Sequence, residues 1–173
     1  MNPFLPFLLT LLLTLSCDPV AREARKAAAE SEVTTFILVR HAEKDFGDDP
    51  VLTAEGTARA ERLRDMLKET TVHEVYTTDT RRTRLTAQPT AEAHQLEAKV
   101  YRIDSLEGLA SRLRNVHAGQ TVLIVGHSNT TPELANYLAG SRELDRFSEL
   151  DYGNLLVVTV PPTGNPRVLK LRY

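Results

Sequence analysis

Short apolar runs alternate with amphipathic stretches along most of the chain. Each run is three or four residues long, and apolar residues recur at helical spacing in the stretch that follows it. The expected strands are 36–39, 75–77, 100–103 and 122–125, and the expected helices run from about 53 to 68, 82 to 93, 105 to 115 and 131 to 140. Two further strands, 154–160 and 167–171, are expected to close the chain as a hairpin.

Alternation of this kind predicts an α/β domain of three layers, with a mainly parallel central sheet covered by helices on both faces. Thr53 is an expected N-cap, and Thr131 is expected to cap the fourth helix with Pro132 in its first turn. Gly140 is expected to end that helix. In such sheets ligands bind outside the carboxyl ends of the strands, so the polar residues that follow each strand are the candidates for function.

The first 32 residues have a different pattern. Residues 1–16 carry no charged side chain, and they are followed by the only cysteine, Cys17, and by a polar stretch. An apolar segment of about 12 residues is too short to span a bilayer as a helix and is typical of a secretory signal. We expect residues 1–17 to be a signal peptide of lipoprotein type with Cys17 lipidated, 18–32 a polar linker, and 33–173 the folded domain. The alternative is a simple cleaved signal in which Cys17 is incidental.

This arrangement predicts an exported protein, periplasmic or in the cell envelope, whose membrane contact is at most an N-terminal lipid anchor. The net charge of -2 and the 6% aromatic content argue against nucleic-acid binding. A single cysteine permits neither an intramolecular disulfide nor a thiolate metal cluster. We expect no metal and no cofactor.

Basic residues follow three of the four predicted parallel strands. They are Arg40-His41, Arg81-Arg82 and the His127 of Gly126-His127-Ser128. A neutral imidazole can attack phosphorus as a nucleophile, and guanidinium groups match phosphate oxygens with paired donors. Meeting at one edge of the sheet, these residues would form a site for a phosphoryl group.

Four stretches together resemble the histidine phosphatase superfamily, which includes phosphoglycerate mutases and bacterial phosphohistidine phosphatases. They are Val39–Glu43, Leu52–Gly56, Val75–Ala87 and Val125–Asn129, in the order found in that family. The resemblance implies a phosphoglycerate mutase-like fold in which His41 is phosphorylated and then hydrolysed by water. It also implies that Arg40, Arg82 and His127 hold the phosphoryl oxygens of a small phosphorylated substrate.

Arg82 matches the family's pocket arginine, four residues before a Thr-Ala pair, whereas Arg81 and Arg84 are expected to be solvated. Thr78 stands where the family usually has serine. His127, if protonated, would add a third positive charge during transfer. The remaining histidines, His73, His94 and His117, are expected to face solvent.

The proton donor to the leaving group is less defined. Asp104 follows the third predicted strand and is the first candidate, with Glu107 and Glu43 as others. Asp104 and Glu107 also have the spacing of a helix capping box, which is a purely structural role. A phosphoramidate or anhydride has a better leaving group and needs no strong acid.

Four other functions are weighed against a phosphatase. Gly126–Thr130 approaches the nucleophile elbow of serine hydrolases, but Thr130 replaces its last glycine and no histidine follows Ser128. A metal site formed by His41, Glu43 and His127 is a second alternative, but the spacing of these residues matches no known pattern of metal ligands. A phosphomutase would need a lid for which the chain has little material, and a non-catalytic phospho-ligand-binding protein would not need every catalytic residue. The loops 44–50, 104–115 and 142–153 are expected to determine the substrate.

Overall fold

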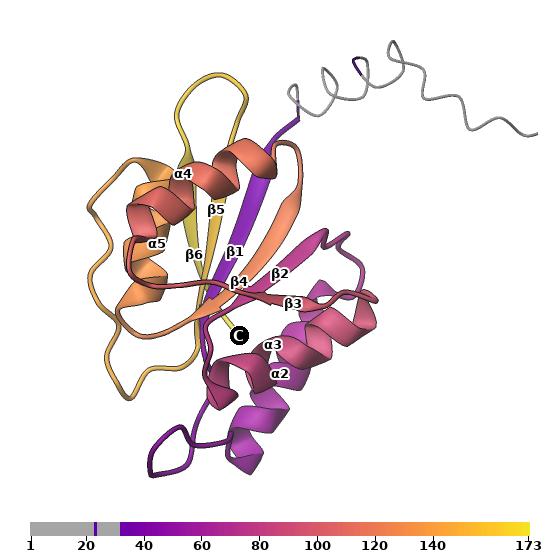
Figure 1. Cartoon of the computed structure of the whole chain (residues 1–173), viewed down its shortest axis with the longest axis vertical. Helices are drawn as coiled ribbons and strands as arrows, with labels where there is room; N and C mark the ends of the chain where they lie inside the picture. The colour runs from indigo at the N-terminus through magenta and orange to yellow at the C-terminus, as the bar shows by residue number, and fades with distance from the viewer. Residues whose placement is uncertain (1–22, 24–31) are drawn as a thin grey trace, which may run out of the picture.

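The computed structural model describes residue 23 and residues 32–173 (Figure 1). The signal peptide expected at 1–17, with Cys17, and nearly all of the expected linker therefore lie outside the described residues. Within the described part of the chain, no helix combines the length and the apolarity that crossing a membrane requires.

A six-stranded sheet in the order β3-β2-β4-β1-β5-β6 forms the centre of the domain. Strands β3, β2, β4 and β1 pair in parallel, whereas β5 pairs antiparallel with both β1 and β6. The expected mainly parallel sheet and the closing hairpin are confirmed. The elements are β1 Thr34–Arg40, α2 Ala54–Leu67, β2 Glu74–Thr77, α3 Arg81–Ala93, β3 Ala98–Val100, α4 Leu106–Val116, β4 Thr121–Gly126, α5 Thr130–Ala139, β5 Asn154–Val160 and β6 Arg167–Arg172.

The sheet separates two hydrophobic cores, as alternation along β1 shows. Phe36 and Leu38 pack on the side of α4 and α5, whereas Ile37 and Val39 pack on the side of α2 and α3. Figure 1 shows the two helix pairs on opposite faces of the sheet. The molecule therefore has the three layers expected, and a strand buried on both faces explains why 36–39 is continuously apolar.

The helix ends agree with the sequence in part. The Thr53 side chain accepts a hydrogen bond from Gly56 N at 3.1 Å, and α5 ends at Gly140 in the left-handed region at φ 66°. Two expected caps are wrong. Ser105, not Asp104, caps α4 by accepting from Gly108 N, and the Thr131 hydroxyl donates to Val39 O instead of capping α5.

The third strand lies earlier than expected, at Ala98–Val100 instead of 100–103. Tyr101 N still donates to Thr77 O, but the chain then leaves the sheet and the Tyr101 ring becomes buried. Val100, the last residue of this short edge strand, and Ile103, beyond its end, are consequently exposed.

Candidate active site

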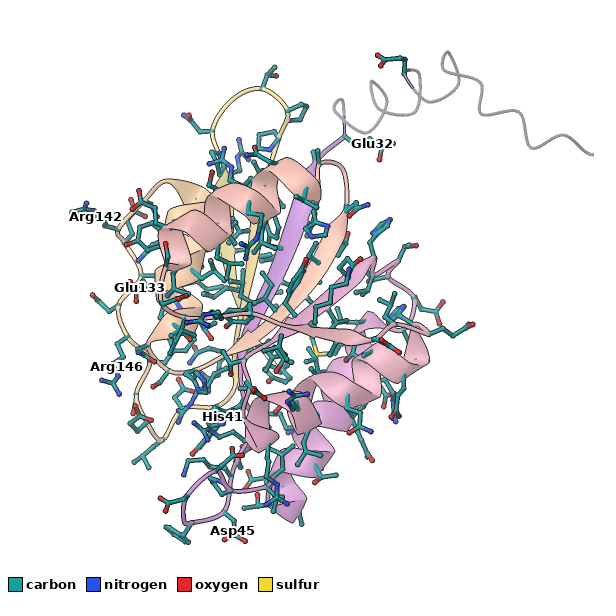
Figure 2. All side chains as sticks on the ribbon, viewed as in Figure 1. Glu32, His41, Asp45, Glu133, Arg142 and Arg146 are labelled. Atoms are coloured by element: carbon teal, nitrogen blue, oxygen red, sulfur yellow. The ribbon has the colours of Figure 1, made fainter. Side chains whose placement is uncertain are left out.

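Three parallel strands bring the predicted residues to one edge of the sheet. His41 follows β1, His127 follows β4, and Arg82 lies in the first turn of the helix after β2. The His41 and His127 ring centroids are 5.6 Å apart with the rings edge to face. Figure 2 shows His41 at this end of the sheet, opposite the end where Glu32 leads into β1.

His41 is buried and its hydrogen bond defines its tautomer. Nδ1 lies 2.8 Å from the carbonyl oxygen of Ala42, which can only accept, so Nδ1 carries the proton. Burial, followed by the charges of Arg40 and Arg82, lowers the pKa of His41 to about 3 despite that bond. His41 is therefore neutral near pH 7, with the lone pair on Nε2.

His127 has the opposite tautomer. The Thr83 hydroxyl has a single proton, and the carbonyl oxygens of Thr78 and Thr80 beside it can only accept, so at its 3.0 Å contact with the Thr78 hydroxyl Thr83 accepts. The Thr78 oxygen, 2.9 Å from His127 Nε2, then accepts from that nitrogen. Burial and the charges of Arg82 and Arg40 lower the pKa of His127 to about 4. The third positive charge expected from His127 is therefore absent near pH 7 unless a bound anion restores it.

The charge of Arg82 contributes to the lowered pKa of both histidines, which the charges of Arg81 and Arg84 do not. Arg82 Nη1 lies 3.6 Å from Asp49 of the 44–50 loop. Arg81 is exposed and Arg84 pairs with Asp79 at 2.6 Å in solvent, as expected. Among the described residues only four buried side-chain polar atoms have no hydrogen-bond partner, and the Arg82 Nε is one of them.

Arg40 is fully buried and is held by the 142–153 loop. Its Nη1 donates to the carbonyls of Ser148, Glu149 and Asp151 at 2.9–3.2 Å, and its Nη2 pairs with the Glu149 carboxylate at 2.9 Å. The Arg40 Nε is a second of the four buried atoms without a partner in the described part of the chain. Buried donors are rarely left unpaired, so two of them beside two neutral imidazoles indicate a receptor for an oxyanion.

Sequence reasoning missed Tyr152 and Glu149 as neighbours of the site. The Tyr152 ring centroid lies 4.1 Å from the Arg40 guanidinium carbon and 5.9 Å from the His41 ring centroid. Glu149 accepts from the Ser128 hydroxyl at 2.7 Å, and this bond, with Arg146 and Arg40, lowers its pKa to about 2. The loop was expected to determine the substrate, but an irregular segment has no periodicity to show which residues turn inward.

The bond between Ser128 and Glu149 also weakens the serine hydrolase alternative. Its nucleophile would need a histidine base, whereas this hydroxyl donates to a carboxylate in an ion-pair network.

Glu43 is wrong as a candidate proton donor. Both of its carboxylate oxygens accept from Arg59 Nε at 2.8 Å. Burial opposes ionisation, but the hydrogen bonds and charge of Arg59 outweigh it and hold the pKa of Glu43 below its usual value. Among the described residues no group of three or more His, Cys, Asp or Glu side chains is arranged to hold a metal ion. His41, Glu43 and His127 therefore do not form the alternative metal site.

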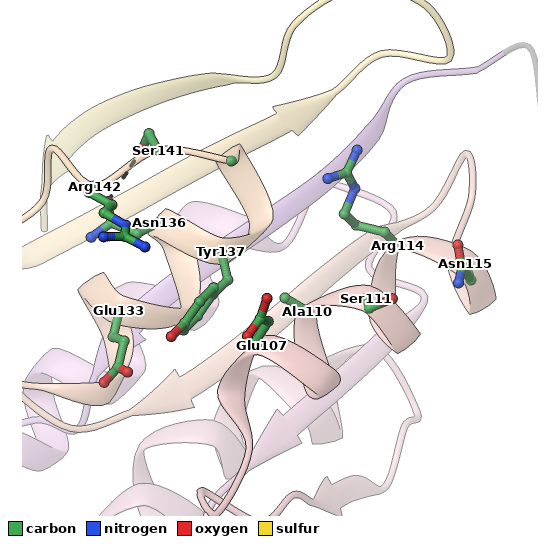
Figure 3. Close-up of a pocket in the computed structure, with 11 residues that line it drawn as sticks. Glu107, Ala110, Ser111, Arg114, Asn115, Glu133, Asn136, Tyr137, Ser141 and Arg142 are labelled. Carbon is green, nitrogen blue, oxygen red and sulfur yellow. Dashed lines mark hydrogen bonds between the residues drawn. The ribbon is translucent and has the colours of Figure 1, made fainter.

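Asp104 lines a cavity of about 390 Å³ together with His127, with its carboxylate 3.0 Å from Arg102 Nε. Glu107 lines a cavity of about 650 Å³ between α4 and α5 (Figure 3), where its carboxylate lies beside Tyr137. It also lines a smaller cavity of about 350 Å³ together with Asp104 and Asn129. Neither of the two cavities that Glu107 lines is lined by His41 or His127, so the structure favours Asp104 over Glu107 as the candidate proton donor.

Of the three histidines expected to face solvent, His73 is exposed, His94 is half-buried and His117 is buried. The ring nitrogens of His117 lie 3.0 Å from the Tyr76 hydroxyl and 2.7 Å from the Gln120 side chain, far along the sheet from His41. Both ring nitrogens are satisfied by the core, so His117 has a structural role.

The comparisons with known proteins agree with this geometry. Residues 36–110 match the model of the histidine phosphatase superfamily, branch 1. No functionally curated protein matches the sequence. Among solved structures, the protein histidine phosphatase SixA complexed with tungstate is similar with a TM-score of 0.68 and 16% identity, over 80% of this chain and 96% of that one.

Two other solved structures are similar. The mycobacterial glucosyl-3-phosphoglycerate phosphatase has a TM-score of 0.63 and 13% identity, over 79% of this chain and 97% of that one. The phosphoglycerate mutase of Bacillus anthracis has a TM-score of 0.61 and 15% identity, over 83% of this chain and 95% of that one. At these identities structural likeness establishes the fold and not the substrate. The family model is matched over the strand that delivers His41 and the helix that delivers Arg82, and over these residues the chain is similar to the histidine phosphatase superfamily.

Proposed function

We propose that the protein is a phosphatase that hydrolyses a small phosphomonoester or phosphoramidate through a phosphohistidine intermediate on His41, without a metal. The observation that carries the proposal is the buried imidazole of His41, which is neutral and has its lone pair on Nε2. The same site contains two buried guanidinium nitrogens, Arg40 Nε and Arg82 Nε, that have no partner in the described part of the chain. That combination supplies a nucleophile and a phosphate receptor in one place.

In the first step His41 Nε2 forms a bond to phosphorus, and the bond from phosphorus to the leaving group breaks. The leaving group departs with the electron pair of that bond. Arg40 and Arg82 offset the charge on the phosphoryl oxygens, and His127 Nε2–H turns from Thr78 to donate to one of them. In the second step a water oxygen attacks phosphorus, the nitrogen–phosphorus bond breaks, and inorganic phosphate leaves with neutral His41 restored.

Water is the proposed acceptor in place of a second alcohol. His41 lies at the edge of the sheet, and the loop that covers Arg40 contributes one large side chain near it, Tyr152. Excluding water from a phosphohistidine would need a more extensive cover. A phosphatase therefore fits better than a mutase.

The test is to trap the intermediate. The full chain, mixed with a ³²P-labelled aryl phosphate and quenched at alkaline pH, should carry acid-labile label on His41 and release phosphate with multiple turnovers. His41→Ala should abolish both, whereas His73→Ala, a change at an exposed histidine, should retain them. Binding of phosphate by the wild type with no label and no turnover would support the ligand-binding alternative, and label passed to added alcohols would support the mutase.

We also propose that the protein is exported and lipid-anchored at Cys17. The support is the uncharged stretch before Cys17 and the polar stretch after it. Cells fed radiolabelled palmitate should label the wild-type protein and not Cys17→Ser. A labelled Cys17→Ser protein would contradict the anchor.

A further inference from the structure

The cavity beside His127 has an apolar lining that the phosphate site does not explain. It opens between the turn Thr78–Thr80 and the segment Val100–Asp104, and its volume is about 390 Å³. Val100 and Ile103 are 45% and 54% exposed there. A volume near the lower end of small-molecule sites accommodates one aromatic ring. Two large apolar side chains left in solvent next to a reactive histidine indicate a contact surface for a ligand.

The charges around this cavity cancel. Asp79 pairs with Arg84 at 2.6 Å, and Asp104 pairs with Arg102 at 3.0 Å. The charged side chains of the lining are therefore paired with one another, in contrast to Arg40 and Arg82, each of which has a buried Nε without a partner in the described part of the chain.

Neither carboxyl group is protected from water. The side chains of Asp79 and Asp104 are 75% and 64% exposed. Burial is the usual device that keeps a catalytic carboxyl group protonated near neutral pH, and this cavity lacks it. A substrate whose leaving group departs without a proton suits such a site.

We propose that this cavity binds the leaving group, and that the leaving group is an uncharged aromatic ring joined to phosphate through a phenolic oxygen. The inference rests on the proposed phosphatase function. As the phosphorus–oxygen bond breaks, the phenolate leaves with the electron pair and then takes a proton from water. A phenol has a pKa of about 10, against about 16 for water, so a phenolate needs far less help from an acid than an alkoxide does.

Kinetics of the full chain test the apolar contact. Phenyl phosphate reacts faster than glycerol 2-phosphate on any enzyme without an acid, so the diagnostic quantity is the change caused by Ile103→Ser. It should lower kcat/KM for phenyl phosphate about tenfold and leave glycerol 2-phosphate within about twofold. Val100→Ser should act in the same direction.

The matched control is Val116→Ser, which changes a 64% exposed valine at the far end of α4. It should alter neither substrate. Because all three side chains are about half exposed or more, the variants are expected to fold, and melting curves check this. An equal fall for both substrates, or an equal effect of Val116→Ser, would overturn the inference.

A binding measurement separates this inference from the proposed function. Calorimetry should show phenylphosphonate, which cannot be hydrolysed, binding the wild type about tenfold more tightly than methylphosphonate, with the difference lost in Ile103→Ser. If that preference is found without any turnover, the proposed function fails and the cavity assignment stands. If turnover is found without the preference, the reverse holds.

Two sources of the same chemistry are separated by a further comparison. A free aryl phosphate and a phosphotyrosine side chain in a peptide both place a ring in the cavity. A higher kcat/KM for a phosphotyrosine peptide than for phenyl phosphate assigns the site to peptides, and the opposite order assigns it to small esters. Hydrolysis of neither, with glycerol 2-phosphate consumed, would contradict the proposal.

Discussion

His41 and His127 lie 5.6 Å apart, yet their hydrogen bonds assign them opposite tautomers. The Ala42 carbonyl keeps the proton of His41 on Nδ1, which leaves Nε2 as a base. The Thr78 hydroxyl keeps the proton of His127 on Nε2, which makes that nitrogen a donor. Two residues of the same type thus supply different groups to the site, a nucleophile from His41 and a hydrogen-bond donor from His127. No sequence motif shows which ring nitrogen carries the proton.

The lowered pKa of His41 makes stability depend on pH. Between pH 6.5 and about pH 3 the His41 side chain is protonated in the unfolded chain and neutral in the folded one. The free energy of unfolding therefore increases with pH in that window, and this contribution to stability disappears as the pH falls. Each such group contributes a slope of about 1.4 kcal/mol per pH unit. His41→Gln should reduce the slope of stability against pH measured by urea unfolding from pH 6.5 to 4.

His73→Gln serves as the control for that experiment, because His73 is exposed. It should leave the slope near its wild-type value. A His41→Gln protein with an unchanged slope would contradict the burial of a neutral imidazole at position 41.

Arg82 and Arg81 are adjacent arginines with different surroundings, which allows a matched test of the phosphate receptor. Arg82→Ala should lower kcat/KM by about 10²–10³-fold, since it removes a preorganised donor, and should also abolish stabilisation by inorganic phosphate. Arg81→Ala should change either quantity by less than about threefold. Phosphate-release assays and melting curves with and without inorganic phosphate measure both, and equal effects of the two changes would refute the assignment of Arg82.

Among the helices, α2 shows why a short motif near its start matters to the site. A Cβ added at Gly56 would collide with the carbonyl oxygen of Glu43, two residues after His41. The missing side chain lets the first turn of α2 pack directly on the chain that carries the nucleophile. The stretch Leu52–Gly56 is thus explained by close packing, not by chemistry of its own.

Gly56→Ala should therefore cost about 1–3 kcal/mol of stability and lower activity, because the collision is with backbone that cannot move aside. Gly108→Ala is the matched control, since both glycines stand three residues after the N-cap of their helix. Its added Cβ meets only the Ser105 hydroxyl at 2.8 Å, and a change within about 1 kcal/mol is expected. Denaturant unfolding of both variants decides, and equal losses would contradict the packing argument.

The 142–153 loop is the element that sequence patterns describe least. Arg40 accounts for four of its anchoring bonds, through Ser148, Glu149 and Asp151. Arg40 could be predicted as part of the site, but its hydrogen bonds to a loop more than a hundred residues away could not. Most of these bonds are accepted by backbone carbonyls, which every residue has and which a pattern of side chains therefore does not reveal.

Glu149→Gln should loosen this loop and move Tyr152 away from His41. We expect kcat/KM to fall about fivefold, with most of the change in KM, because a bond to a charged group is replaced by a weaker neutral one. Glu143→Gln, at an exposed position of the same loop, should change neither parameter. Steady-state kinetics with phenyl phosphate measure both, and an unchanged Glu149→Gln enzyme would show that the loop does not position Tyr152.

For the molecule as a unit, the layers, the mainly parallel sheet and the meeting of His41, His127 and Arg82 at one end of it could be predicted from the sequence. Buried strands and the rule that sites form at their carboxyl ends account for that success. The failures share a cause: the end of β3, the partner of Glu43 and the surroundings of Glu107 depend on contacts between distant segments. Local pattern places a residue on an element, but only packing decides what its side chain meets.

The direction of β1 has a consequence for where substrates come from. The chain enters this strand at Thr34 and leaves it at Arg40, and seven extended residues cover roughly 20 Å. Glu32 and His41 lie at opposite ends of the sheet (Figure 2). If the proposed anchor at Cys17 holds the domain through the residues before 32, the cleft that leads to His41 would face away from the membrane. Dissolved phosphoesters would then reach the site more readily than the headgroups of the bilayer.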